Sequence, residues 1–221
     1  MASTIGQPLT RVLLSDQVYA RVRALIISGE LEPGDRLVES EIARQLKVSQ
    51  APVREAVKRL VHEGLAQHAP RRGSFVAKVS PDDASAARAV RLVIEELAAR
   101  TVAERTAAVQ PSAEAWDALR EQVEAMREAA AEGNVGRFRD ADISFHRAVC
   151  EASGNPFLPK VWAVMEPSLR ALRVVSDPLF TGDWAAMAEQ HAGLLAALES
   201  AGPEAAAAQF AAHARGDIPG H

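Results

Sequence analysis

The sequence of 221 residues contains few of the features that mark secreted, membrane or nucleotide-binding proteins. Its single cysteine, Cys150, excludes an internal disulfide and a zinc–thiolate cluster, as expected for a protein of the reducing cytoplasm. No apolar run is long enough for a membrane span or a signal peptide. Repeats and phosphate-binding glycine loops are also absent. We therefore expect a cytoplasmic protein without a membrane segment.

Alanine is abundant, hydrophobic residues make up 48% of the chain and aromatic residues only 5%, which together favour a mainly α-helical protein with an ample core. The net charge of −4 is unevenly distributed. Residues 11–80 hold 12 basic and 8 acidic side chains, whereas the rest holds 13 and 21. This asymmetry indicates one module that binds nucleic acid and a second module with another task.

The N-terminal part is expected to contain a helix-turn-helix at about 39–58. Helices are predicted at 15–28 and 39–46, and a third runs through 48–65 after a tight turn. Val53, Val57 and Leu60 recur at helical spacing in the third, which leaves Arg54 and Lys58 on the opposite face. A short basic helix after such a turn suits a DNA major groove, although the stretch alone also fits an ordinary charged surface helix.

Two short extended segments, 65–69 and 74–79, follow the third helix and predict a hairpin. A hairpin at this place is the wing of a winged helix-turn-helix. Arg71 and Arg72 in its turn could contact a phosphate or the minor groove, and the alternative is a solvated loop. We expect the DNA-binding domain to cover 9–79.

The remainder, 80–217, is predicted to be an all-α bundle of about six helices for effector binding and dimerisation. Proline, glycine and asparagine breaks separate helices at about 82–108, 112–132, 135–153, 156–176, 183–200 and 203–216.

Four residues of this bundle could bind a metal ion. Asp142 and His146 are four residues apart and share one helix face. His191 and His213 lie in later helices among apolar neighbours. Spacing alone also fits ordinary core or surface histidines. If the four side chains converge, they suit a divalent ion, zinc first and nickel, manganese or iron as alternatives, with open positions for water or an anionic ligand.

Other polar residues of the bundle are candidate contacts for a small-molecule effector. Arg91 and Glu95 form an i, i+4 pair whose alternative role is a surface salt bridge. Arg170 and Arg173 are further cationic candidates, and Asn155 could orient a partner. The tryptophans are expected to serve packing more than a ligand cage.

The run from Pro33 to Leu65, with its string VSQAPVREAVKRLVHEGL and the later RRGSFV, resembles the winged helix-turn-helix of GntR-family bacterial transcription regulators. The resemblance implies DNA contacts at both helices and the wing. Together with the basic side chains above, the candidates are Ser40, Arg44, Ser49, Gln50, Pro52, Arg54, Lys58, Arg71, Arg72 and Gly73. Position 50 departs from the family, where arginine commonly reads guanine. Glutamine pairs better with adenine, so we expect the operator to differ from the usual family preference unless Gln50 touches only phosphate.

Residues 81–216 resemble the FCD effector domain of the FadR-type branch of that family, through the Asp-x-x-x-His of Asp142 and His146, the ASGNP of 152–156, His191 and His213. In metal-binding members these four positions are ligands. The family's R-x-x-x-E pattern at Arg91 implies an inward arginine, which could grip a carboxylate beside the metal.

Together these features predict a DNA-binding transcriptional regulator, a repressor and a homodimer that binds a palindromic operator. A divalent metal and a small carboxylate effector would modulate operator binding, and no enzyme activity is expected. Two alternatives stay open at this point: a metal-dependent enzyme with a DNA-binding appendage, and a regulator whose metal is purely structural.

Overall fold

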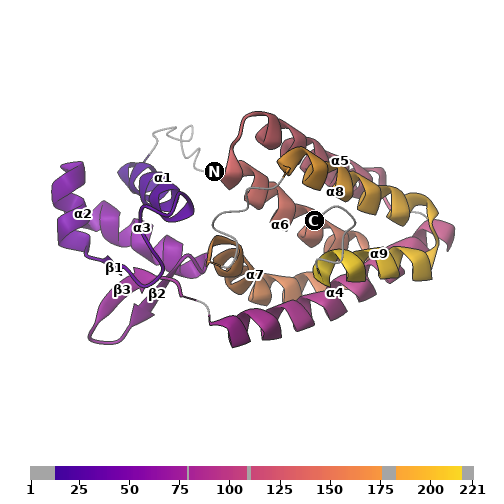
Figure 1. The fold of residues 1–221 in the computed structure, drawn as a ribbon, viewed down its shortest axis with the longest axis horizontal. Coiled ribbons are helices and arrows are strands. Elements are labelled where there is room, and N and C mark those ends of the chain that lie inside the picture. Colours follow the sequence, from indigo (N-terminus) through magenta and orange to yellow (C-terminus); the bar gives the residue numbers. More distant parts are fainter. Residues whose placement is uncertain (1–12, 79, 109–110, 176–182, 216–221) are drawn as a thin grey trace, which may run out of the picture. The chain divides into compact units, whose positions relative to one another are not determined.

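The computed structural model describes residues 13–78, 80–108, 111–175 and 183–215, with the backbone alone for 81 and 171–175 (Figure 1). The chain divides into two compact units, Met1–Val76 and Ala77–His221. Each has its own buried apolar residues.

Three helices and a small sheet form the N-terminal unit. The helices are α1 (Leu14–Ile27), α2 (Glu39–Leu46) and α3 (Gln50–His62). α3 packs against both other helices and buries Val53, Val57 and Leu60, as their spacing predicts. Lys47, with a left-handed φ of 55°, ends α2 and turns the chain toward α3. The predicted helix-turn-helix is confirmed.

The predicted wing is present as an antiparallel hairpin of β2 (Ala66–Ala69) and β3 (Gly73–Val76). A further strand, β1 (Arg36–Leu37), pairs with the other edge of β3, so that the sheet order is β1-β3-β2. No strand at this place was predicted from the sequence. A strand of two residues carries no alternation, and it exists only because β3 offers it hydrogen bonds.

Six helices make up the described part of the C-terminal unit, which confirms the predicted bundle. They are α4 (Pro81–Ala108), α5 (Ala113–Ala131), α6 (Val135–Ala152), α7 (Leu158–Val175), α8 (Trp184–Ser200) and α9 (Pro203–Arg215). Ser112, Asn134 and Asp183 begin α5, α6 and α8, each accepting a hydrogen bond from a backbone N–H of the first turn. No described helix is long and apolar enough to cross a membrane.

The core of the bundle surrounds α6. Helix α4 lies along α9, and α5 lies along α6 (Figure 1). Phe138, Phe145, Trp162 and Phe210 are almost completely buried between them. Three polar side chains, Asp142, His146 and His191, are as deeply buried as these aromatics.

Candidate functional site

The exposed surface of α2, α3 and the wing contains the residues predicted to contact DNA. Eight of the ten are exposed, and Pro52 and Gly73 are partly buried. The three cations of the helices are each paired with a carboxylate: Nε of Arg54 lies 3.2 Å from Glu39, Nζ of Lys58 lies 2.9 Å from Glu55, and Arg44 pairs with Glu41. Exposed pairs of this kind contribute at most about 1 kcal/mol, so phosphates can replace the carboxylates at low cost.

The wing turn has a backbone conformation that is uncommon for its residues. Arg71 adopts a left-handed φ of 63°, Gly73 has a φ of 98°, and the N–H of Arg72 donates to the carbonyl of Ala69 across the turn. The guanidinium of Arg72 lies 5.8 Å from the ring centroid of Phe75. This tight turn leaves both arginines exposed at its tip.

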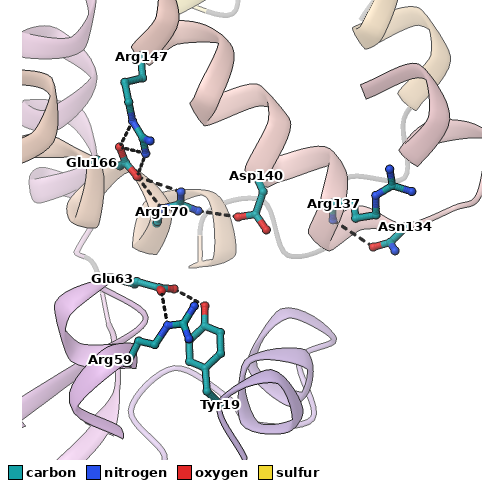
Figure 2. A network of polar contacts seen from close by, with 9 residues as sticks. All are labelled: Tyr19, Arg59, Glu63, Asn134, Arg137, Asp140, Arg147, Glu166 and Arg170. Carbon is teal, nitrogen blue, oxygen red and sulfur yellow. Dashed lines mark hydrogen bonds and ion pairs between the residues drawn. The ribbon is translucent and has the colours of Figure 1, made fainter. Parts of the chain in front are cut away.

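A polar contact between α1 and α3 supports the DNA-binding unit (Figure 2). The hydroxyl of Tyr19 donates to Glu63, and the guanidinium of Arg59 lies 3.8 Å above the Tyr19 ring while its Nε donates to Glu63. Burial and the Glu63 carboxylate raise the pKa of Tyr19 to about 12. Arg59 is therefore held by contacts with Tyr19 and Glu63 of its own unit.

In the C-terminal unit, α6, α8 and α9 bring together Asp142, His146, His191 and His213. One ligand atom from each of the four lies within 4.8 Å of those of the others. Asp142, His146 and His191 are at most 1% exposed, and His213 is partly exposed. Two of the ring pairs are in edge contact, with His191 and His213 centroids 4.7 Å apart. Such a set of three imidazoles and one carboxylate matches the donors that bind zinc and similar ions.

Hydrogen bonds determine which nitrogen of His191 faces the cluster. Its Nδ1 lies 2.8 Å from the carbonyl oxygen of Met187, which can only accept, so Nδ1 carries the proton. In the neutral ring Nε2 then holds a lone pair. This Nε2 lies 3.1 Å from Oδ1 of Asp142 and makes no hydrogen bond with any described residue. The Met187 carbonyl one turn earlier on α8 thus orients a ligand nitrogen toward the cluster.

His146 is oriented by two residues of α4. Nη2 of Arg91 lies 3.1 Å from Nε2 of His146, and because a guanidinium only donates, this Nε2 accepts. The proton is then on Nδ1, which lies 3.3 Å from Oε1 of Glu95. Burial lowers the pKa of His146 well below its ordinary value, and the charge of Arg91 lowers it further. The imidazole is neutral, as a metal ligand must be.

Arg91 and Glu95 form a buried pair at the edge of this cluster. Nε of Arg91 donates to Oε1 of Glu95, and the two side chains are 11% and 1% exposed. The alternative of an exposed surface salt bridge is therefore wrong for this pair. Arg91 places a positive charge directly beside the metal-ligand candidates.

The other predicted effector contacts have different surroundings. Arg170 contacts Asp140 and Glu166, and Glu166 also accepts from Arg147 (Figure 2). The side-chain oxygen of Asn155 accepts from the N–H of Phe157 and so shapes the start of α7. The side chain of Arg173 lies outside the described part of the structure. Of the predicted effector residues with described side chains, Arg91 and Glu95 have contacts with the cluster.

Comparisons with known proteins agree with both units. Residues 14–76 match the model of bacterial regulatory proteins of the gntR family, and residues 87–216 match the FCD domain. The chain belongs to the GntR family. It is 31% identical over 211 residues to a probable D-xylose utilization operon transcriptional repressor of Paenarthrobacter nicotinovorans, covering 96% of this chain and 90% of that one. As a member of this family the chain is a DNA-binding transcriptional regulator and not an enzyme.

Solved structures of similar fold include Escherichia coli McbR/YncC, with a TM-score of 0.66 and 24% identity over 94% of this chain and 96% of that one. A putative GntR regulator from Rhodococcus sp. RHA1 has a TM-score of 0.67 and 23% identity over 92% and 94%. At these sequence identities the similarity shows only that the fold is shared.

Two neighbours of the cluster were not predicted from the sequence. The Met187 carbonyl carries no side-chain signal, although its position four residues before His191 is where a helical carbonyl would lie. Trp162, expected to serve packing, stacks on His146 with ring centroids 6.0 Å apart.

Proposed function

We propose that this GntR-family regulator is a homodimeric repressor of which the FCD domain binds a divalent metal ion and a small carboxylic acid, and that the acid alters operator affinity. The convergence of Asp142, His146, His191 and His213 beside Arg91 supports this proposal most directly. Membership of the GntR family supports DNA binding, and the chemistry of the residue cluster supports the binding of a metal ion and an acid.

The donor set fits a metal ion. Nε2 of His191 and Oδ1 of Asp142 approach to 3.1 Å in a buried place, and both atoms attract a cation. The Met187 carbonyl orients His191 in the manner of an outer partner of a metal ligand. The Glu95 carboxylate lies 3.3 Å from Nδ1 of His146, which makes no hydrogen bond with any described residue. Zinc fits this set, as do nickel, manganese and iron. Once bound, such an ion supplies a positive charge that can hold an anionic oxygen at an open position.

Arg91 is the proposed contact for the acid. One of its N–H groups donates to Glu95, and Nη2 donates to the lone pair of His146 Nε2. That lone pair cannot serve Arg91 and a metal ion together. Ligation through Nε2 would therefore release an Arg91 N–H, which can then donate to a carboxylate. This competition predicts that the acid binds better to metal-loaded protein. Effector contacts by Asn155, Arg170 and Arg173 stay predictions.

Exposed apolar side chains support a homodimer. In the C-terminal unit, the large hydrophobic residues that are exposed in the described part lie on the neighbouring helices α4 and α7 or directly before α7: Val90, Val93 and Leu97 on α4, Phe157 just before α7, and Val161 and Val164 on α7. On α4 the spacing of Val90, Val93 and Leu97 forms one stripe away from the core. Exposed apolar side chains that gather on neighbouring helices often mark interfaces, and a two-fold dimer suits a palindromic operator.

Operator binding with and without ligands tests the proposal. DNA from upstream of the gene would be titrated with metal-free and zinc-loaded protein, each with and without acetate, succinate or citrate, and followed by fluorescence anisotropy. We expect at least one acid to change the affinity about 10-fold in the zinc-loaded protein, and less in the metal-free protein.

Equal affinity under all conditions would favour the alternative in which the metal is purely structural. Arg91→Lys keeps the positive charge but loses the two parallel N–H donors of the guanidinium. It should weaken the effect of the acid on operator affinity while leaving zinc content and basal DNA affinity unchanged. Loss of the acid effect without loss of zinc would separate the acid site from the metal site.

A further inference from the structure

The indole N–H of Trp162 is a buried donor that no described residue satisfies. The residue is 1% exposed and lies on α7, and its ring is nearly parallel to the imidazole of His146, with an interplanar angle of 27°. Buried tryptophan N–H groups usually have an acceptor, because leaving one without a partner costs about 1 to 3 kcal/mol. This donor belongs to a ring that stacks on a metal-ligand candidate, so an oxygen atom of a bound ligand could serve as its acceptor.

We propose that Trp162 is a specificity-determining residue of the effector site and donates its Nε1–H to an oxygen atom of the bound acid. The inference rests on the proposed function. Arg91 and Trp162 both contact His146, one through Nη2 at 3.1 Å and the other through the stacked ring. An acid bound next to His146 would therefore be adjacent to Arg91 and to the ring of Trp162.

The chemistry of the donors defines the ligand class. Arg91 and Trp162 only donate, so the ligand must bring acceptors to both. A carboxylate has two oxygens with about four acceptor positions, enough for an arginine, an indole and a metal ion together. Amines and sugars without an acidic group lack the charge that Arg91 and a metal ion attract. A buried water on Nε1 is the competing explanation, because ordered water often satisfies such donors.

Nuclear magnetic resonance of the indole groups can distinguish an acid from water. The chain has three tryptophans, so protein labelled with 15N-tryptophan gives three indole signals, and Trp162→Phe identifies the one of interest. The zinc-loaded full-length protein would be titrated with acetate, succinate and citrate at constant ionic strength. We expect the chemical shift of the Trp162 signal to change with acid concentration and to saturate at the same concentration as acid binding. The Trp116 and Trp184 signals should shift less.

Isothermal titration calorimetry of the variants measures their affinity for the acid. Trp162→Phe keeps an aromatic ring beside His146 but removes the donor, and we expect acid affinity to fall about 10-fold or more with unchanged zinc content. Trp116→Phe is the matched control, since Trp116 is also buried but lies in α5, and should bind the acid as the wild type does.

The outcomes separate the two proposals. Saturable acid binding with an unmoved Trp162 signal and an unchanged Trp162→Phe affinity would overturn the role of Trp162 and favour a water, while the proposed effector site would stand. If no acid in the series binds the zinc-loaded wild type, the proposed function and the role of Trp162 both fail. Loss of zinc in Trp162→Phe would assign the residue to packing around His146 instead.

Discussion

Nε2 of His191 lies 3.1 Å from Oδ1 of Asp142, inside the bundle, although the two residues belong to different helices. The Met187 carbonyl holds the His191 proton on the opposite ring nitrogen, so in the neutral ring a lone pair faces a carboxylate oxygen. A second ring proton on Nε2 would make this contact a hydrogen-bonded ion pair, and a cation bound between the two atoms would satisfy both of them as well. The contact therefore suits a metal ion, and the experiments below distinguish an ion from a proton.

Replacement of the proposed ligands should abolish metal binding. We expect Asp142→Ala and His191→Ala each to lower the zinc content measured by elemental analysis, and the double variant Asp142→Ala with His146→Ala to abolish it. Because a bound ion stabilises the folded state, chelation should lower the melting temperature of the wild type and not that of the double variant.

Asp140→Ala is the matched control for these variants, since Asp140 is a carboxylate on the same helix that pairs with Arg170. It should retain its zinc. A full complement of zinc in the double variant would contradict the assignment of the ligands.

Arg54 is expected to contribute to DNA binding more than to folding. It is exposed at the start of α3, and Glu39 is its described partner. We expect Arg54→Ala to weaken operator binding by about 1 to 3 kcal/mol, roughly 5- to 150-fold, measured by fluorescence anisotropy. The melting temperature should change little.

A matched control is Arg120→Ala, which removes an arginine exposed to a similar degree from α5 and should leave DNA affinity unchanged. Equal DNA affinity of Arg54→Ala and the wild type would mean that the recognition surface lies elsewhere.

Gln50 should influence the operator sequence. It is exposed at the first residue of α3, and its amide can pair with adenine, whereas arginine pairs with guanine. We expect Gln50→Arg to shift the preferred base at one symmetric position of each half-site from adenine toward guanine in a selection from random DNA. Unchanged preference together with weaker binding would indicate that Gln50 touches only the phosphate backbone.

The apolar stripe of α4 should control dimerisation. Val93 is 62% exposed, so glutamate in its place costs the monomer little but places a charge in a two-fold apolar contact, where each copy would face the other. We expect Val93→Glu to shift the protein toward monomers in analytical ultracentrifugation and to weaken operator binding. Ala185→Glu on the exposed first turn of α8 is the control and should remain dimeric. Dimers of unchanged strength in Val93→Glu would place the interface elsewhere.

Glu166 should stabilise the bundle in a pH-dependent way. Burial alone would raise the pKa of Glu166, but hydrogen bonds and charges from Arg147 and Arg170 outweigh it and lower this pKa below 4.5 (Figure 2). Because the folded-state pKa is the lower one, the carboxylate stabilises the protein above the unfolded pKa, and this contribution is lost as the pH falls through the folded pKa.

We therefore expect Glu166→Gln to reduce the free energy of unfolding by about 1 to 3 kcal/mol at pH 7, measured in urea, and the difference from the wild type to shrink toward pH 3. Glu204→Gln, at a pair that is largely exposed on the carboxylate side, should cost at most about 1 kcal/mol. A constant difference between Glu166→Gln and the wild type across the pH range would exclude the carboxylate charge as its cause.

Periodicity and breaks in the sequence determined most of the architecture. The apolar spacing of Val53, Val57 and Leu60 predicts α3 and its buried face, and turn residues predict the hairpin of the wing. The breaks before α5, α6 and α8 coincide with the capping residues Ser112, Asn134 and Asp183. These signals are local, so a single sequence contains them in full.

The site depended on the tertiary structure. Sequence spacing could place only Asp142 and His146 on one face, because two residues of one helix have a known separation. His191 and His213 come from other helices, and sequence spacing does not reveal how those helices pack. The inward direction of Arg91, the carbonyl behind His191 and the unsatisfied N–H of Trp162 likewise follow from the packing of α4, α7 and α8 around α6. Local pattern thus determined which elements form, and only their packing decided which side chains meet.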